Sequence, residues 1–288
     1  MCFPIPTDTI EPTNPEIDVQ YKPRCQGRRR HMSIIGITWN KSVLVSFDPA
    51  MGIITAKHAW LDPTQNFVGL TYDYGRNLLY AVSQAPALNL YTVNPLTRDV
   101  TLIGQLTING DDVSGLAYDP LSGTLYTLIL HLGTPLRTDL ARINPDNLQT
   151  TVVGTMANVL GESLCWRDID GQLNAYTVQG GGSWDSPYKA SIVTIDPTTA
   201  AMTVLFETPY HTILGLAKKP GQDAYFSWVN WTSHFYADVN LSSKQVTTLG
   251  NSDPVGVASG AMISKTFYVA PAPNLPPCSF TDSECLGL

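Results

Sequence analysis

The sequence lacks the patterns that would place it among helical or membrane-spanning proteins. No stretch of its 288 residues shows a convincing amphipathic helix. No apolar run is long enough for a signal peptide or a membrane-spanning helix, so we expect no membrane span. Closed β architectures commonly reach this length as one unit, so the length by itself does not argue for two domains.

Basic residues are also scarce. The chain has 17 Lys and Arg against 24 Asp and Glu, which gives a formal net charge of −7. Five of the basic residues fall in the first thirty-one positions, and the rest of the chain holds twelve against twenty acids. Because phosphate binding needs a clustered basic surface, this balance argues against nucleic acid as a partner.

The common catalytic signatures are missing as well. The sequence has no Gly-x-Ser-x-Gly elbow, no His-Glu-x-x-His, no Cys-x-x-Cys, no phosphate-binding loop and no dinucleotide fingerprint. The glycine run at 180–182 is not a phosphate cradle, because no helix is expected after it. The histidines are scattered at spacings that show no metal-ligand pattern.

What the sequence does contain is a repeat of about fifty residues. One half of the repeat has the form Gly-Leu-Ala-Tyr-Asp and occurs at 68–73, 114–119, 162–167, 214–218 and 255–259. The other half ends in Asp-Pro or Asn-Pro and occurs at 45–49, 91–95, 141–145 and 193–197, with a degraded copy at 236–240. Val, Ile, Leu, Thr and Tyr dominate the short runs, and Gly, Pro, Asp and Asn separate them, which favours strands joined by turns.

A period of this length with four short β-type runs is typical of a propeller blade. Over residues 33–270 the chain resembles β-propeller proteins at the level of architecture. It resembles no particular propeller family, because WD40 and kelch signatures are absent. The resemblance implies an all-β propeller of four-stranded antiparallel blades. Residues 1–32 are Pro-rich and are expected to form an extended or disordered arm, and residues 271–288 form a C-terminal tail.

One blade is assigned from inner to outer strand as 113–118, 124–129, 139–143 and 150–154. The same assignment fits blades that start at Phe67, Glu162 and Ile213. A further blade is split between the termini: 255–260 supplies its inner strand, and 43–47 and 53–57 supply its two outer strands. We expect five blades, with six as the alternative, because 34–39 and 266–270 both resemble the second strand of the closing blade.

A glycine column at 69, 115, 215 and 256, with Ser163 filling it once, supports the ring. Inner strands crowd around a central axis, where a side chain would collide with the neighbouring strand. We therefore interpret these glycines as structural rather than as part of a nucleotide site.

The cysteines and sequons favour an extracellular location, although the sequence contains no leader. Cys2 and Cys25 flank the arm, Cys278 and Cys285 flank the tail, and Cys165 falls in an inner strand. Two terminal pairs suit an oxidising compartment, and Asn-x-Ser/Thr sequons occur at 40–42, 230–232 and 240–242. The expected form is a monomer.

The topology indicates where to look for a site. The turns between the first and second and between the third and fourth strands of each blade are short and stereotyped, as at 119–123 and 94–98. The loops on the opposite face are longer and irregular, including 131–137 and 179–189, and binding usually resides in such loops.

Aromatic residues concentrate on the long-loop face and predict a binding surface. Rings on a wet surface stack on sugars or anchor a partner protein, although loop tryptophans also fold back to cap the core. The residues assigned to ligand binding there are Trp39, Trp60, Trp184, Tyr188, Trp231, Arg137 and His211.

A polar ring is predicted at the mouth of the channel on the same face. Asn66, Asp112 and Asp253 occupy equivalent positions before the glycine column, and their oxygens could hold Ca²⁺. His211 could act with Asp112, Glu162 or Asp253 as an acid–base pair.

These observations lead to two function classes and to a third hypothesis, that the polar ring is purely structural and the protein is an interaction scaffold. The first is a non-enzymatic recognition module that binds glycan or protein through the aromatic loops. The alternative is a propeller hydrolase or lyase that uses a metal or a His–carboxylate pair at the channel mouth. The propeller fold hosts both classes, so the site has to decide between them.

Overall fold

The computed structural model describes residues 32–38, 43–48, 53–60, 65–84, 87–95, 97, 99–179, 190–210, 213–219, 222–229, 235–251 and 257–264. Side chains are described from residue 65 onward, with gaps. The strands lie in one compact unit, residues 31–267. In the described ranges no helix is long and apolar enough to cross a membrane.

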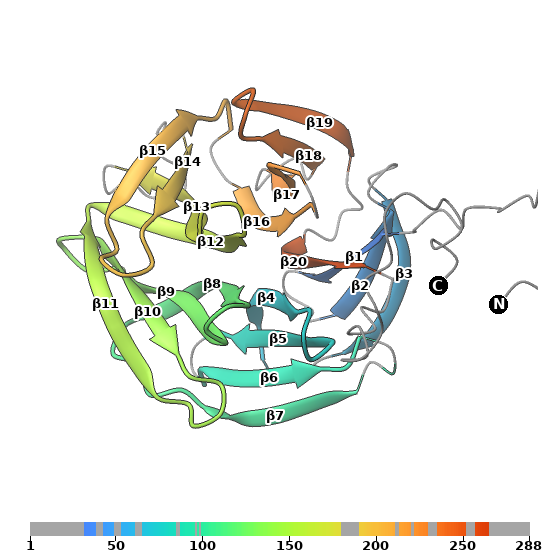
Figure 1. Cartoon of the computed structure of the whole chain (residues 1–288), viewed down its shortest axis with the longest axis horizontal. Helices are drawn as coiled ribbons and strands as arrows, with labels where there is room; N and C mark the ends of the chain where they lie inside the picture. The colour runs from blue at the N-terminus through green and yellow to red at the C-terminus, as the bar shows by residue number, and fades with distance from the viewer. Residues whose placement is uncertain are drawn as a thin grey trace, which may run out of the picture. The chain divides into compact units, whose positions relative to one another are not determined.

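The described residues form twenty strands in five four-stranded antiparallel sheets, arranged as the blades of a propeller (Figure 1). Blade 1 comprises β4 (Phe67–Asp73), β5 (Leu78–Ser83), β6 (Asn89–Val93) and β7 (Val100–Gln105). Blade 2 comprises β8 (Asp112–Asp119), β9 (Thr124–His131), β10 (Arg137–Ile143) and β11 (Thr150–Ala157). Blade 3 comprises β12 (Val159–Arg167), β13 (Gln172–Gln179), β14 (Ala190–Ile195) and β15 (Met202–Glu207). Blade 4 comprises β16 (Ile213–Lys218), β17 (Ala224–Val229), β18 (Phe235–Asn240) and β19 (Gln245–Asn251).

The closing blade joins the two ends of the ring, as expected. Its inner strand is β20 (Val257–Ser264), which is followed outward by β1 (Met32–Thr38), β2 (Val43–Asp48) and β3 (Ile53–Trp60). β20 and β1 are antiparallel, with Met32 opposite Ser264 and Gly36 opposite Gly260. The five-blade prediction is therefore confirmed, and β1 is the second strand of the closing blade. Residues 266–270 lie outside the described residues.

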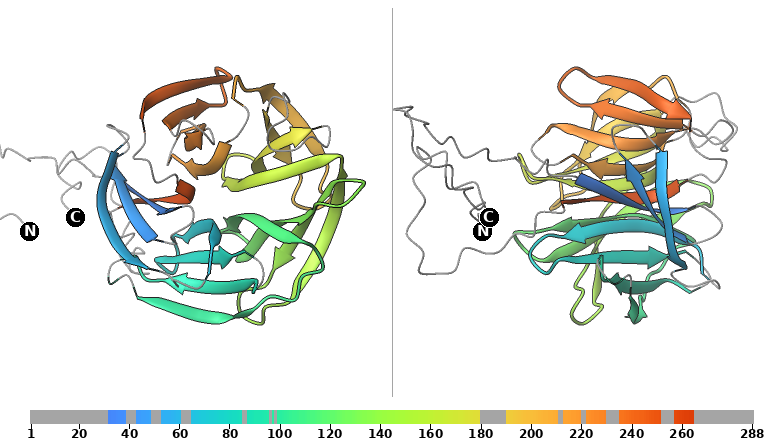
Figure 2. Two further views of the ribbon diagram at one scale, coloured as in Figure 1. Left: turned by 180° about the vertical axis from the view of Figure 1, so that it is seen from behind. Right: turned by 90° about the vertical axis from the view of Figure 1, so that its right-hand side faces the viewer.

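The inner strands β4, β8, β12, β16 and β20 contact one another in a closed cycle around the axis (Figures 1 and 2). The glycine column lies where they meet. A Cβ atom at Gly69 would lie 2.7 Å from Leu116 Cβ, and one at Gly115 would lie 2.6 Å from the backbone nitrogen of Leu164. Gly115 also has φ +68°, a conformation that favours glycine. The crowding predicted for this column is confirmed at these two positions.

A β-bulge interrupts the inner strand at this same level in four blades. The pairing with the second strand shifts at Phe67/Gly69, Ser114/Leu116, Gly161/Ser163 and Ile213/Gly215. A bulge bends the strand and increases its local twist.

Asp and Asn residues close the short turns. Asp119 is buried and accepts hydrogen bonds from the backbone nitrogen of Leu121 and from Ser122 Oγ. At the end of the third strand, Asn144 Oδ1 accepts from the nitrogen of Asp146 at 2.9 Å, and Asp196 Oδ1 accepts from that of Thr198 at 2.7 Å. The Asp/Asn-Pro signal in the sequence is thus a turn signal.

The core consists of the apolar layers between adjacent blades. Leu79, Leu90, Leu125 and Ile143 are completely buried, whereas the outer strands β7, β11 and β15 show exposed side chains along much of their length. Each interface therefore buries the faces of two sheets, and each outer strand borders solvent.

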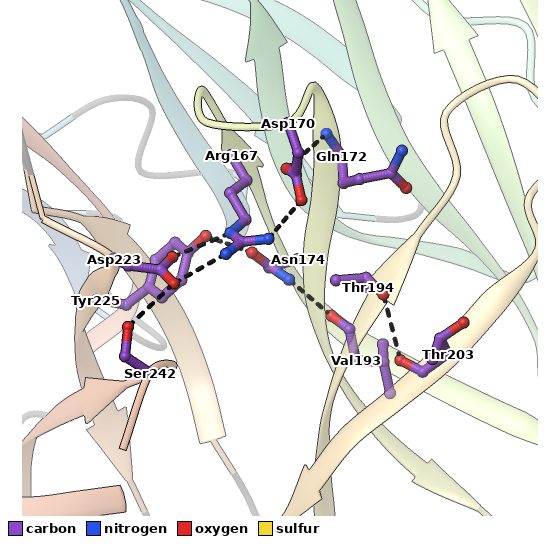
Figure 3. A network of polar contacts seen from close by, with 10 residues as sticks. All are labelled: Arg167, Asp170, Gln172, Asn174, Val193, Thr194, Thr203, Asp223, Tyr225 and Ser242. Carbon is purple, nitrogen blue, oxygen red and sulfur yellow. Dashed lines mark hydrogen bonds and ion pairs between the residues drawn. The ribbon is translucent and has the colours of Figure 1, made fainter. Parts of the chain in front are cut away.

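Polar bridges also join neighbouring blades, most clearly blades 3 and 4 (Figure 3). Arg167 Nε and Nη2 donate to the two carboxylate oxygens of Asp223 at 3.0 and 2.8 Å. The same guanidinium binds Asp170 within its own blade. Beside this pair, Tyr225 OH donates to Asn174 Oδ1 at 2.5 Å in a buried position. These contacts connect β12 and β13 to β17 and to the turn that precedes it.

Candidate ligand-binding site

The structure describes only part of the binding surface predicted on the long-loop face. Arg137, Asn66 and Asp112 are described with their side chains. The predicted loop position of Trp60 is wrong, because Trp60 is the last residue of β3 and pairs with Val43 of β2. The predicted residues outside the described residues are Trp39, Trp184, Tyr188, Trp231, His211 and Asp253.

Arg137 begins β10, and the hairpin that connects β9 to β10 places it directly opposite His131. The connecting loop contains a cis peptide bond between Thr134 and Pro135. Asp111 fastens the start of this loop, because its carboxylate accepts a hydrogen bond from the backbone nitrogen of Leu132 at 2.6 Å. Arg137 and Asp139 are two residues apart in one strand, so their side chains share a face of the blade.

Four side chains form a hydrogen-bonded chain that we call the Arg137 relay: Thr155, Asp139, His131 and Arg137. Thr155 Oγ1 donates to Asp139 Oδ1 at 2.6 Å, and Asp139 Oδ2 lies 2.8 Å from His131 Nε2. The guanidinium Nη2 of Arg137 lies 3.3 Å from His131 Nδ1. Since a guanidinium only donates, Nδ1 is the acceptor and the ring proton resides on Nε2, from which it binds Asp139.

Burial decreases along the relay from Asp139 to Arg137. The Asp139 side chain is 10% exposed and that of His131 is 14% exposed, whereas Arg137 is exposed. Both ring nitrogens of His131 are engaged, so the imidazole is not available as a base in this arrangement. The guanidinium keeps its other N–H donors for solvent or a ligand. The relay is thus suited to hold the guanidinium of Arg137 in a fixed orientation at the surface.

Sequence reasoning identified Arg137 but missed His131 and Asp139. The available signal was an Arg and an Asp two residues apart in one strand, opposite a histidine at the end of the preceding strand. In a hairpin this spacing brings the three side chains together on one face.

Two of the residues predicted to bind Ca²⁺ are brought close together, through Gln84. The backbone nitrogen of Gln84 donates to the carbonyl oxygen of Asn66 at 2.6 Å, and Gln84 Nε2 donates to Asp112 Oδ2. The other oxygen of Asp112 accepts from the backbone nitrogen of Val113 at 2.8 Å. Donors therefore face both oxygens of this carboxylate. No group of three or more His, Cys, Asp or Glu that could hold a metal occurs within the described ranges, and with Asp253 outside them the Ca²⁺ site remains a prediction.

Glu162, named with the polar ring, is a buried side chain of β12. It is 5% exposed, and neither carboxylate oxygen has a hydrogen-bond partner. Burial raises the pKa of this carboxyl from 4.5 to about 8. Glu162 is thus a carboxyl kept in an apolar setting at the inner strand.

A small cavity of about 50 Å³ lies among the inner strands at the turn face. Tyr72, Tyr118 and Trp166 contribute rings from three blades, and Lys218 occupies the same place in the fourth. Cys165 also borders the cavity, and burial raises the pKa of its thiol to about 12, which disfavours the reactive thiolate. This cavity is large enough for only a few waters or one small apolar group.

Comparison with solved structures defines the class of protein by its fold. The chain resembles one from a structure of a nidogen/laminin complex, with TM-score 0.57 and 11% identity, over 80% of this chain and 98% of that one. It also resembles a protein of unknown function from Bacteroides thetaiotaomicron, with TM-score 0.51 and 12% identity, over 76% of this chain and 58% of that one. At such low identity the likeness is one of fold alone. No protein-family model and no curated protein matches the chain. The molecule is a β-propeller.

Proposed function

We propose that this propeller is a non-enzymatic recognition module that binds a glycan or protein ligand on its long-loop face. The observation that carries the proposal is the engagement of both His131 ring nitrogens, one by Asp139 and the other by Arg137. In a hydrolytic site the imidazole would need a free nitrogen to accept a proton from the nucleophile. Here the imidazole instead positions a guanidinium.

Arg137 would serve as the anchor for an acidic group of the ligand. Guanidinium binds carboxylate through two parallel hydrogen bonds, and a fork whose direction is already set loses less conformational entropy on binding. The aromatic residues that the sequence predicts in the long loops would add flat apolar area for a sugar ring or a protein side chain. A carboxylate-bearing glycan offers both features, so we place it first among the ligands.

The test is a glycan-array comparison of the wild-type protein with Arg137→Gln. We expect acidic glycans to bind the wild type, and the variant to lose about tenfold or more in affinity, because a hydrogen bond to a charged group is worth roughly 1.5–3 kcal/mol. Hits are then measured by isothermal titration calorimetry with both proteins.

Two further variants test whether the affinity for the ligand depends on the Arg137 relay. Asp139→Asn should weaken the same ligand by a smaller factor, since it loosens the orientation of His131 without removing the guanidinium. Lys244→Gln, which changes an exposed lysine in the β18–β19 turn of blade 4, should leave this affinity unchanged. Equal affinity of Arg137→Gln and wild type for the ligand, or turnover of the ligand by the wild type, would contradict the proposal.

A further inference from the structure

The opposite face of the propeller, formed by the short turns, contains a cavity larger than the one bordered by Tyr72, Tyr118 and Trp166. It is open to solvent and has a volume of about 320 Å³. Three turns of two blades supply its walls: the β4–β5 and β8–β9 turns and the β10–β11 turn. We call it the turn-face cavity, and the lining residues used below are Arg76, Thr124, Arg142, Asn144, Asp146 and Gln149.

The walls of this cavity are fixed by local contacts. Asn144 closes the β10–β11 turn, since its backbone nitrogen donates to the carbonyl of Gln149 at 3.0 Å and its carbonyl accepts from Leu148 at 2.8 Å. Leu148 adopts φ +60° and reaches across to blade 1, where a Cβ atom on Gly104 would lie 2.5 Å from its Cδ1. The turn is therefore fastened to the neighbouring blade, and the cavity exists before any ligand arrives.

Arg76 is held on the side of blade 1. Its Nη1 donates to Tyr80 OH at 3.1 Å and lies 3.6 Å from Asp146 Oδ1, and its Nε lies 3.8 Å from Asp73 Oδ2. The charge of Arg76 is thus already shared with two carboxylates. This arrangement links the turns of two blades and leaves Asp146 as an acceptor at the rim.

Arg142 differs from Arg76 in its partners. It is exposed, lines the cavity, and makes no ion pair with a carboxylate among the residues that the structure describes. The charged residues that line the cavity are two arginines and one aspartate, so the lining carries a positive excess in a protein of net charge −7. An anionic group of a ligand could therefore pair with Arg142 in this cavity.

The remaining lining groups indicate what else the ligand carries. Hydroxyls of serine and threonine and the amides of Asn144 and Gln149 offer both donors and acceptors, and none of the described residues that line the cavity is aromatic. Such a set suits several hydroxyl groups rather than an apolar body. The volume is near the lower end of ligand sites, which run from roughly 300 to 1,000 Å³.

We propose that the turn-face cavity binds a sugar acid, a small polyhydroxylated ligand with one carboxylate. The carboxylate pairs with Arg142, and the hydroxyls exchange hydrogen bonds with Asn144, Asp146 and Gln149. A doubly charged phosphate is disfavoured because Asp146 shares the cavity. This site is separate from the Arg137 relay, and either can fail without the other.

The experiment is a titration of the isotope-labelled whole chain followed by backbone amide chemical shifts, with D-glucuronate as probe and D-glucose as its neutral counterpart. We expect saturable shifts with glucuronate at Gly123, Asp146 and Gln149, and at least tenfold weaker binding of glucose. Methyl β-D-glucuronide distinguishes a free sugar acid from one at the end of a glycan, because its anomeric oxygen is blocked.

Matched variants then test whether Arg142 binds the carboxylate of glucuronate. Arg142→Gln should weaken glucuronate at least tenfold, and Arg142→Lys should lie between that variant and wild type, because it keeps the charge without the planar fork. Lys244→Gln, which removes an exposed charge from a turn of blade 4, should bind glucuronate like wild type. Absence of saturable shifts, equal binding of glucose, an unaffected Arg142→Gln, or displacement of glucuronate by equimolar inorganic phosphate would each overturn the proposal.

Discussion

At the scale of single residues, Glu162 is a carboxyl held in an environment that disfavours its charge. Both oxygens are buried without a partner, so the ionised form is disfavoured and the pKa is raised to about 8. The unfolded chain releases this proton near the ordinary value of 4.5. Between these two values the folded state binds more protons, and its free energy of unfolding must fall as pH rises.

Glu162→Gln removes that dependence, because glutamine does not ionise. The variant should resemble wild type most closely near pH 4.5 and gain on it as pH rises toward 8, with a slope of up to roughly 1.4 kcal/mol per pH unit. Urea unfolding at pH 5, 6.5 and 8 measures the difference. The exposed Glu207→Gln is the control, and its unfolding free energy should run parallel to that of wild type. A constant offset for Glu162→Gln would contradict the argument.

At the scale of the element, the inner strands combine a bulge with close approach of their neighbours. Gly115 shows both features. Its φ is +68°, and a Cβ atom there would lie 2.6 Å from the backbone nitrogen of Leu164 in β12. Neither the backbone of Leu164 nor that of Ser163 can move aside without displacing blade 3.

Gly115→Ala should therefore lower the free energy of unfolding by about 2 kcal/mol or more, from the left-handed conformation and the overlap together. Gly133→Ala is the matched control, because a Cβ there meets no atom within 4 Å. Chemical denaturation of the two variants measures the contrast. Similar stability of the two would show that the ring relaxes around the added methyl group.

The elements were the part of the molecule that sequence could predict. The strands expected at 113–118, 124–129, 139–143 and 150–154 match β8 to β11 to within a few residues. Turn chemistry is local, so the Asp/Asn-Pro signals mark the ends of strands in the four repeats that carry them.

The sites were predicted less well, for a physical reason. The turn-face cavity needs Arg76 beside Asp146, and only the packing of blade 1 against blade 2 brings these turns together. A repeat gives the position of a turn within its blade but not the side chains that a neighbouring blade presents to it. The short turns were interpreted as structural because the sequence does not show which side chains the neighbouring blade presents to them. Arg137 was found because the sequence placed it at the end of an irregular loop, although it is the first residue of β10, whereas its partners lie within the strands predicted as regular.

At the scale of the whole molecule, the blades are separate sheets, and the contacts between them hold the ring together. Figure 3 shows one such contact, where Arg167 of blade 3 binds both oxygens of Asp223. The hydrogen bond from Arg167 holds the pKa of Asp223 below its ordinary value of 3.8. The pair therefore contributes stability above that ordinary value and loses it as pH falls through the lowered pKa.

Asp223→Asn should lower the free energy of unfolding at pH 7 by about 1 kcal/mol, since the pair is only partly buried. The difference from wild type should shrink in acid as the wild-type carboxylate is protonated. Asp170→Asn removes the other acid bound to the same guanidinium within blade 3, and should cost less than about 0.5 kcal/mol. Thermal unfolding at several pH values compares the three proteins. An equal loss of unfolding free energy in Asp223→Asn and Asp170→Asn would contradict the idea that the ion pair between blades contributes more than the one within blade 3.

The pairing of β20 with β1 determines when the propeller can be completed during synthesis. The strands of blades 1 to 4 are consecutive in the chain, so each sheet can form as its last residues leave the ribosome. β1, β2 and β3 are made first but have no inner strand until residue 264 has been translated. During most of translation the inner edge of β1 therefore lacks its partner strand and is open to pairing with another chain, so misassembly is a risk until β20 has been made.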